Sequence, residues 1–191
     1  MVENDMIFRK IFRYFNKILI FKWKLGLARW INIWPHGFGR FMVITHSGRK
    51  SGKKYQTPIN YAVLDGEIYC VAGFGHQSDW YQNILKNPSI EIWLKEGWWA
   101  GEAKDISNDP NRTAIMREVL IGSGFAAPLF GIHHTKMDDE TLDQLTQPYR
   151  LVRIKRTRER TGRKGPDEYT WVWPIATIFL FLLLTNKRKN K

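Results

Sequence analysis

The sequence is poor in the residues that cross-link small proteins or hold metal ions. Its 191 residues include a single cysteine, Cys70, which excludes an intramolecular disulfide and a cysteine-rich zinc site. Cys70 lies in the apolar run 67–72, so we expect a buried and unreactive thiol. The adjacent His133 and His134 have no acidic or histidine residue at metal-ligand spacing to support them, and no metal site is predicted.

The residue groupings of common hydrolases are also missing. No Ser/His/Asp set and no close pair of carboxylates appears in a recognisable context, which argues against serine hydrolase and glycosidase chemistry. The N-terminus has no uninterrupted apolar stretch, because basic residues recur from Arg9 to Lys24. We therefore expect no cleavable signal peptide and a main domain on the cytoplasmic side.

The net charge of +12 is located at the two ends of the chain. Residues 1–36 hold seven basic and two acidic residues, and residues 146–191 hold twelve basic and three acidic residues. Residues 37–145 hold eleven basic and thirteen acidic residues. A nucleic-acid-binding domain would carry the excess on its folded module, so no nucleic-acid partner is expected. Basic ends on a near-neutral core favour an anionic membrane surface.

Both ends of the chain have helical patterns with large apolar residues. Residues 6–24 place Ile7, Ile11, Phe15, Ile18 and Leu19 near one face, with basic residues among them. This predicts an amphipathic helix, which either packs on the domain's own core or lies on lipid headgroups. Residues 169–186 carry no charge, begin with aromatic residues and precede a basic tail. They predict a hydrophobic helix that anchors the chain in a membrane, of roughly 27 Å at about 1.5 Å per residue.

The central region reads as a β-protein. β-Branched or alternating runs predict strands over 41–45, 57–64, 67–72, 89–94, 98–106 and 149–156. Asp65-Gly66 and Glu96-Gly97 are typical of tight hairpin turns. Short helices are predicted over 79–86 with Ser78 as N-cap, from Asp109-Pro110 to about residue 121, and over 138–145, with a loop over 122–136. Local hairpins favour an antiparallel sheet, and closing it into a small barrel removes its exposed edges.

The stretch 47–54, Ser-Gly-Arg-Lys-Ser-Gly-Lys-Lys, has the chemistry of an anion-binding loop. It is not a nucleotide P-loop, since only three residues separate Gly48 from Gly52 and Lys54 stands where Ser or Thr is needed. Two glycines nevertheless allow backbone N–H groups to approach an anion, and four cations lie within six residues. The alternative is a solvated basic hairpin loop.

The order of several such pieces resembles the deazaflavin-dependent nitroreductase family. The pieces are Thr45–Gly52, then Thr57-Pro-Ile-Asn60, Asp65-Gly66, Ala72-Gly-Phe-Gly75, and Asp79-Trp-Tyr-Gln-Asn83 with Asn87-Pro88. The resemblance covers about residues 38–106. It implies a split β-barrel, which agrees with the six predicted strands. Together with the patterns at the two ends, the expected fold is mainly β (α+β): a six-stranded split β-barrel with flanking helices, an N-terminal amphipathic helix and a C-terminal hydrophobic helix.

The resemblance also implies a cofactor, coenzyme F-420, and the residues that hold it. The basic loop would bind the phosphate and glutamate tail, and the broken strand end and the following helix would line the ring. The implied cofactor-binding residues are Arg49, Lys50, Ser51, Gly52, Lys53, Pro58, Asn60, Gly73, Phe74, Gly75, Trp80 and Tyr81. The reduced coenzyme would pass a hydride to an electron-poor acceptor stacked on its ring. No catalytic side chain is assigned.

Departures from the family pattern bear on the acceptor. Phe74 occupies a place where some nitroreductases have lysine, and the stretch 122–130 has no tyrosine where they carry several. An apolar acceptor, such as a quinone or an enone, fits these residues better than a nitro compound does. We therefore expect an F-420-dependent oxidoreductase that acts at a membrane surface.

Two other functions remain open at this point. One is an FMN-binding flavoprotein reductase on the same barrel, and the other is a non-enzymatic protein that holds a cofactor or haem at a membrane surface. The expected organisation is 1–36 as basic N-terminal helices, 37–156 as the barrel, 157–168 as a charged linker and 169–191 as the membrane segment. The other expected partners are membrane lipid and a second copy of the chain, in a homodimer.

Overall fold

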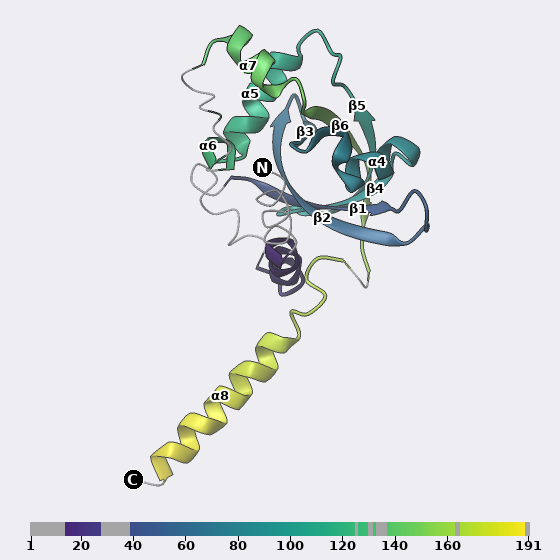
Figure 1. Cartoon of the computed structure of the whole chain (residues 1–191). Coiled ribbons are helices and arrows are strands. Elements are labelled where there is room, and N and C mark those ends of the chain that lie inside the picture. The colour runs from purple at the N-terminus through teal and green to yellow at the C-terminus, as the bar shows by residue number, and fades with distance from the viewer. Residues whose placement is uncertain are drawn as a thin grey trace.

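The computed structural model describes residues 14–27, 39–124, 126–129, 132, 137–162 and 165–189. Its centre is a closed antiparallel barrel with strand order β1-β2-β3-β6-β5-β4 (Figure 1). The strands are β1 (Phe41–Ser47), β2 (Lys54–Leu64), β3 (Glu67–Ala72), β4 (Ser89–Leu94), β5 (Gly97–Asp105) and β6 (Arg150–Arg160). The six-stranded barrel predicted from the sequence is therefore confirmed.

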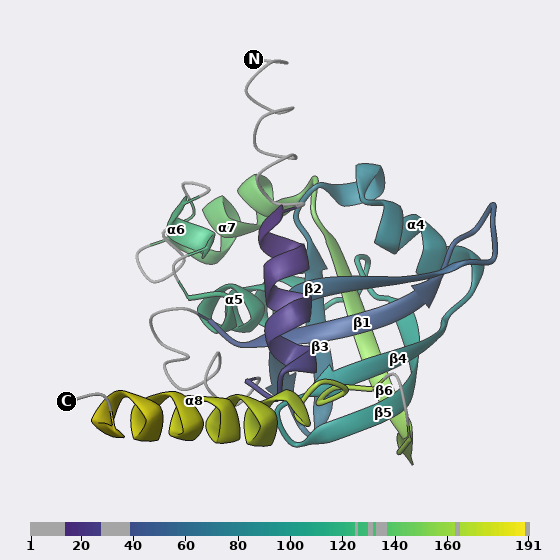
Figure 2. The ribbon, with the colours of Figure 1, turned by 90° about the horizontal axis from the view of Figure 1, so that it is seen from below.

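Helical elements flank the barrel on several sides (Figures 1 and 2). They are a helix over 14–24, η1 (Gly75–Gln77), α4 (Asp79–Lys86), α5 (Arg112–Gly122), α6 (Ala126–Leu129), α7 (Asp139–Thr146) and α8 (Val172–Lys189). We call the first of these helix 14–24. Residues 6–13 of the predicted amphipathic helix lie outside the described residues, as do residues 28–36 of the predicted N-terminal segment and His133 and His134.

Strand alternation explains how the core forms. In β3, Ile68, Cys70 and Ala72 are buried, and the residues between them are less so. Cys70 is fully buried, as predicted, and burial raises the pKa of its thiol. Inward-facing residues of this kind make the barrel interior, together with Met42, Ile44, Ile92 and Ile154.

The strand β1 is buried on both of its faces. Met42 and Ile44 face the barrel interior, and Val43 packs with Trp23, Trp93 and Trp98 on the outside. Trp23 belongs to helix 14–24, so this helix covers the outer face of β1 and β4. A third buried cluster, with Met116 and Leu142, joins α5 and α7 to the barrel.

Some sequence-based boundaries need correction. Strand β6 continues to Arg160, so residues 157–160 belong to the barrel and not to the predicted linker. Helix α5 begins at Arg112 with Asn111 as its N-cap, and the carboxylate of Asp109 instead accepts the backbone N–H of Asn111. Ser78 is the N-cap residue of α4 but makes no side-chain capping bond. The predicted loop over 122–136 contains α6.

The predicted transmembrane helix is the main correction. Among the described residues, no helix combines the length and the apolar character that crossing a membrane requires. The reason lies in the bounds of α8, because its eighteen residues include the basic Lys187, Arg188 and Lys189. The rest of the helix spans about 22 Å at about 1.5 Å per residue, against roughly 30 Å of hydrocarbon.

Candidate cofactor and acceptor site

The site is a pocket of about 960 Å³ on one side of the barrel. It lies between the β1–β2 loop, the turn after β3, the start of α4, and the helices α5 and α6. Volumes of this size are typical of pockets that enclose a cofactor or a drug-sized ligand. Eight of the twelve predicted cofactor residues line it: Arg49, Lys50, Ser51, Pro58, Asn60, Gly73, Phe74 and Trp80.

The β1–β2 loop has a conformation that depends on its glycines. The backbone N–H of Gly52 donates to the carbonyl of Gly48 at 2.8 Å, and that of Gly48 donates to the carbonyl of Lys53 at 2.8 Å. Gly52 has a φ of +66°, a backbone conformation that residues other than glycine rarely adopt. A Cβ on Gly48 would lie 2.7 Å from the ring of Tyr55. The sequence Ser-Gly-Arg-Lys-Ser-Gly therefore folds into a tight loop beside α4 (Figure 2).

The loop is attached to α4 through the side chain of Asn83. The Asn83 Oδ1 accepts the backbone N–H of Arg49 at 2.9 Å and the Arg49 Nη1 at 3.2 Å. The same Nη1 lies 3.0 Å from Asp79 Oδ1. Asn83 is buried. These bonds hold the first residue of the cationic loop in one position relative to the helix.

His46 completes this network from the barrel side. Because Asn83 Oδ1 is occupied by Arg49, its Nδ2 is the group that donates to His46 Nδ1, at 3.1 Å. The other ring nitrogen, Nε2, then carries the proton and donates to Thr57 Oγ1 at 3.1 Å. Burial lowers the pKa of His46 to about 4, against a smaller opposing effect of Asp79. A neutral imidazole thus supports the loop.

The four cations of the loop do not act alike. Arg49 is bonded to α4, and the Lys54 ammonium lies 2.6 Å from Glu91 on β4. Lys50 and Lys53 are exposed, and neither has an ion-pair partner among the described residues. Of these two, only Lys50 lines the pocket. It is therefore the cation best placed to meet an anionic group there.

Four predicted residues lie outside the pocket lining: Gly52, Lys53, Gly75 and Tyr81. The ring of Tyr81 is fully buried, and its hydroxyl donates to Asp105 Oδ2 on β5 at 2.8 Å. Burial and this hydrogen bond raise the pKa of Tyr81 to about 12. Tyr81 therefore anchors α4 to the barrel. Gly75 has a φ of +52°, and a Cβ there would collide with the carbonyl of Pro148.

The opposite end of the pocket is apolar. Its lining there comes from α5, α6 and Phe41, with buried side chains of Phe41, Val119, Leu120, Ala127 and Ile132. The apolar stretch 122–130 indicated part of this wall, whereas the contributions of Phe41 and Val119 depend on contacts between distant parts of the chain. Phe15 and Asn16 of helix 14–24 also line the pocket, and the Phe15 ring lies 6.4 Å from that of Phe41.

The donor set of the pocket fits a deazaflavin with an anionic tail. The Lys50 ammonium and the loop can meet the tail, and Trp80 offers a flat apolar wall for a ring. A Cβ at Gly73 would meet no atom within 4 Å, so the backbone after β3 is open to a ligand.

Residues 34–124 match the family model of the F420H(2)-dependent quinone reductases. The match includes β1 to α5, and so the cationic loop, the turn after β3 and α4. It confirms the family resemblance, the enzymatic activity as an oxidoreductase and the coenzyme, F-420, with FMN as an alternative only. Among the described residues, no cluster of side chains could hold a metal ion.

Several solved structures are similar to this chain. A conserved hypothetical protein from Mycobacterium tuberculosis is 20% identical, with a TM-score of 0.49, over 76% of this chain and 84% of that one. An F420-H2 dependent reductase, FDR-A, is 16% identical, with a TM-score of 0.43, over 61% of this chain and 94% of that one. The heme storage protein HutZ from Vibrio cholerae is 12% identical, with a TM-score of 0.43, over 68% and 90%. Such likenesses carry no ligand from one chain to another.

Proposed function

We propose that this F-420-dependent oxidoreductase reduces an apolar, electron-poor acceptor, with a quinone as the best candidate, at a membrane surface. The observation that supports the proposal is the division of one pocket into a cationic end and an apolar end. Lys50 and the β1–β2 loop form the first, and buried aliphatic residues of α5 with Phe41 form the second. A charged coenzyme tail requires the cationic end, and an uncharged ring acceptor requires the apolar end.

The residues would act by binding and orientation. Lys50 would hold the coenzyme tail, Trp80 and the backbone at Gly73 would face its ring, and Val119 and Leu120 would exclude water from the acceptor. When bound, the reduced coenzyme supplies a hydride. A quinone that takes up this hydride and one proton becomes the hydroquinone, and the coenzyme is left oxidised.

The acceptor class can be tested with a panel of compounds of similar ring size. The purified protein is given reduced F-420 and a quinone, an enone or a nitroaromatic compound, and oxidation of the coenzyme is followed by its absorbance. We expect kcat/KM to be highest for the quinone. Equal binding of FMN or haem in competition titrations, without turnover of any acceptor, would contradict the proposal.

A matched pair of variants tests the apolar wall. Val119→Thr places a hydroxyl in the wall, and Val152→Thr makes the same change at an equally buried position of β6 outside the pocket. Burying an unpaired hydroxyl costs about 1–3 kcal/mol. We expect KM for the quinone to rise about fivefold or more in Val119→Thr only. The same change in KM in both variants would remove the acceptor from this wall.

We further propose a membrane association with the barrel on the cytoplasmic side. The segments 1–36 and 169–191 would face the lipid, and the barrel would carry the pocket. Support comes from the basic ends of the chain, which suit the anionic lipids of the cytoplasmic leaflet. Cell fractionation would test the membrane association, and a reporter fused to the barrel would test whether the barrel lies on the cytoplasmic side.

A further inference from the structure

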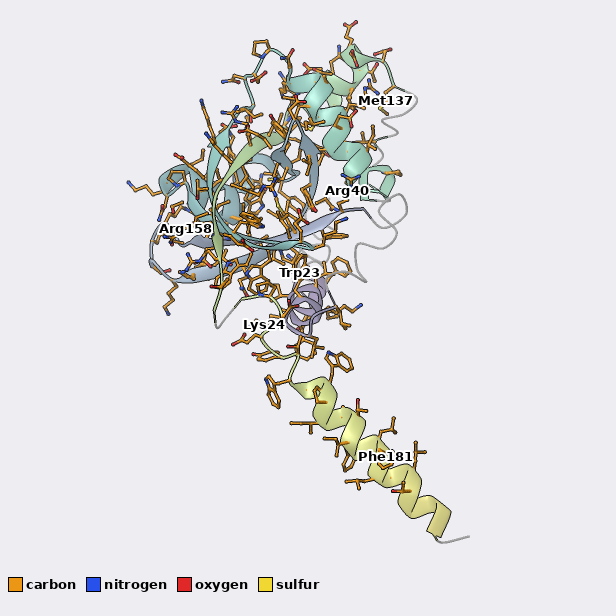
Figure 3. All side chains as sticks on the ribbon, turned by 180° about the vertical axis from the view of Figure 1, so that it is seen from behind. Trp23, Lys24, Arg40, Met137, Arg158 and Phe181 are labelled. Carbon is orange, nitrogen blue, oxygen red and sulfur yellow. The ribbon has the colours of Figure 1, made fainter. Side chains whose placement is uncertain are left out.

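Helix 14–24 has two faces of different character. Leu19 and Trp23 are buried against the barrel, whereas Tyr14, Ile18 and Phe21 are exposed, Ile18 and Phe21 each by 54%. Figure 3 shows Trp23 between this helix and the barrel. The ring of Phe21 lies 6.3 Å from that of Tyr169, yet the described part of the chain leaves about half of Ile18 and Phe21 uncovered. Large apolar groups that gather on one exposed face mark a contact with another apolar surface.

The C-terminal end of helix 14–24 is joined to the start of α8. The backbone N–H of Asp167 donates to the carbonyl of Trp23 at 3.1 Å, and that of Tyr169 to the carbonyl of Lys24 at 2.7 Å. The indole N–H of Trp173 donates to the carbonyl of Leu25 at 2.8 Å. The Lys24 ammonium lies 2.9 Å from Glu168. Two segments about 150 residues apart in sequence thus form one structural unit.

Helix α8 is apolar on all sides. From Ile175 to Leu184, its large apolar residues are exposed by 52–65%. Figure 3 shows side chains projecting from all sides of the helix around Phe181. The helix projects from the barrel as a free rod (Figure 1). A protein partner on one face would leave the other faces in water, whereas acyl chains cover all of them.

The charge around this unit suits an anionic surface. Residues 14–27 contain Lys17, Lys22 and Lys24 and no acidic residue, and α8 ends in three basic residues. Each lysine near an anionic membrane contributes about 1 kcal/mol to binding. The exposed apolar groups and the exposed cations Lys17 and Lys22 occur together on helix 14–24, where the Lys17 ammonium lies 5.8 Å from the centre of the Tyr14 ring.

The same helix reaches the mouth of the pocket. Phe15, on the first turn of the described helix, lines the pocket and contacts Phe41, while Ile18 and Phe21 continue the exposed face toward α8. We propose that helix 14–24 and α8 form one lipid-contacting surface, inserted in a single leaflet of an anionic membrane, which places the pocket mouth at the lipid. An apolar acceptor dissolved in the membrane would then enter past Phe15.

This inference rests on the proposed function only for the identity of what enters. The lipid contact is tested by binding of the full-length protein to vesicles with and without anionic lipid. The test variant is Ile18→Glu with Phe21→Glu. The matched control, Leu85→Glu with Leu145→Glu, changes two apolar residues of α4 and α7 that are each 47% exposed. A third variant, Phe179→Glu with Leu183→Glu, tests α8.

We expect the wild type and the control to bind anionic vesicles, and both test variants to bind at least tenfold more weakly. A long-chain quinone carried in the vesicles should be reduced at least tenfold more slowly by Ile18→Glu/Phe21→Glu. A short, water-soluble quinone without vesicles should be reduced equally by all four proteins, because none of the altered residues lines the pocket.

The outcomes separate the two proposals. Vesicle binding without reduction of either quinone would overturn the proposed acceptor and leave the lipid surface standing. Equal vesicle binding by wild type and test variants would overturn the lipid surface. So would a stable wild-type oligomer, formed without lipid and lost in the test variants, because a second copy would then be the occupant.

Discussion

The free energy of unfolding of the barrel should fall between neutral and mildly acidic pH, because unfolding allows the buried His46 to bind a proton. The side chain is only 3% exposed, and its ring stacks on Tyr55 with centroids 6.1 Å apart. Its two nitrogens are bonded to Thr57 and Asn83, and the nearby charged groups are Asp79 and Arg49 on the other side of Asn83. A proton on Nδ1 would face the N–H of Asn83 and break the bond.

The size of the effect follows from the pKa of His46. Burial lowers it from 6.5 to about 4, so the unfolded chain binds a proton at mildly acidic pH that the folded protein does not. The contribution of His46 to the free energy of unfolding is therefore fully present above pH 6.5 and is lost as the pH falls toward 4. At about 1.36 kcal/mol per pH unit, the contribution of His46 to the loss between pH 7.5 and pH 5 is about 2 kcal/mol.

The assay is urea unfolding at several pH values, in the wild type and in His46→Gln. Glutamine can accept from Asn83 and donate to Thr57 without titrating. With an m-value of about 2 kcal/mol per molar, the wild-type midpoint should fall by about 1 M more than that of the variant. Parallel curves for the two proteins would refute a buried, neutral His46. The affinity for F-420 should likewise fall more in the wild type than in His46→Gln as the pH is lowered, because the hydrogen bonds of His46 and Asn83 hold the β1–β2 loop.

Three further predictions concern the pocket and its frame. Lys50→Glu should weaken F-420 binding at least tenfold in a fluorescence titration, from a charge-assisted bond of about 1.5–3 kcal/mol, while Lys95→Glu in the β4–β5 turn should not. Trp80→Phe should weaken binding about two- to tenfold by thinning the aromatic wall, and Trp99→Phe, packed on the same core but outside the pocket, should leave affinity unchanged. Gly75→Ala should lower the free energy of unfolding by at least about 2 kcal/mol, because its φ and the Pro148 carbonyl both oppose a Cβ. Gly52→Ala, where a Cβ meets open space, should lower it by about 1 kcal/mol only, and equal losses would contradict the steric explanation.

The parts of the fold that could be predicted from the sequence are those specified by neighbouring residues. Strand β3 alternates buried and less buried residues, and Asp65-Gly66 marks its hairpin with β2, where Asp65 adopts a φ of +50°. The ordered motifs likewise placed Arg49, Gly73 and Trp80 around one pocket, because each lies in or beside a turn with its own local signal.

The parts that were missed depend on contacts between distant residues. The end of β6 is rich in charge, yet Arg156 and Arg160 lie over the rings of Trp99 and Trp98 on β5, 5.3 and 5.0 Å from their centroids. Their long side chains pack as apolar groups there, so a strand has the composition of a linker. His46 reads as an exposed polar residue until Asn83, 37 positions later, supplies its buried partner.

The place of β6 in the barrel has a consequence for the order of folding during synthesis. This last strand lies between β3 and β5 and pairs with the edge of each that would otherwise be open. Fifty-five residues separate the end of β5 at Asp105 from the end of β6 at Arg160, or roughly 3–11 s of translation at about 5–20 residues per second. During that interval the nascent chain has two open sheet edges, which invite pairing with other chains. Premature termination before residue 150 should therefore yield an aggregating product and not a smaller enzyme.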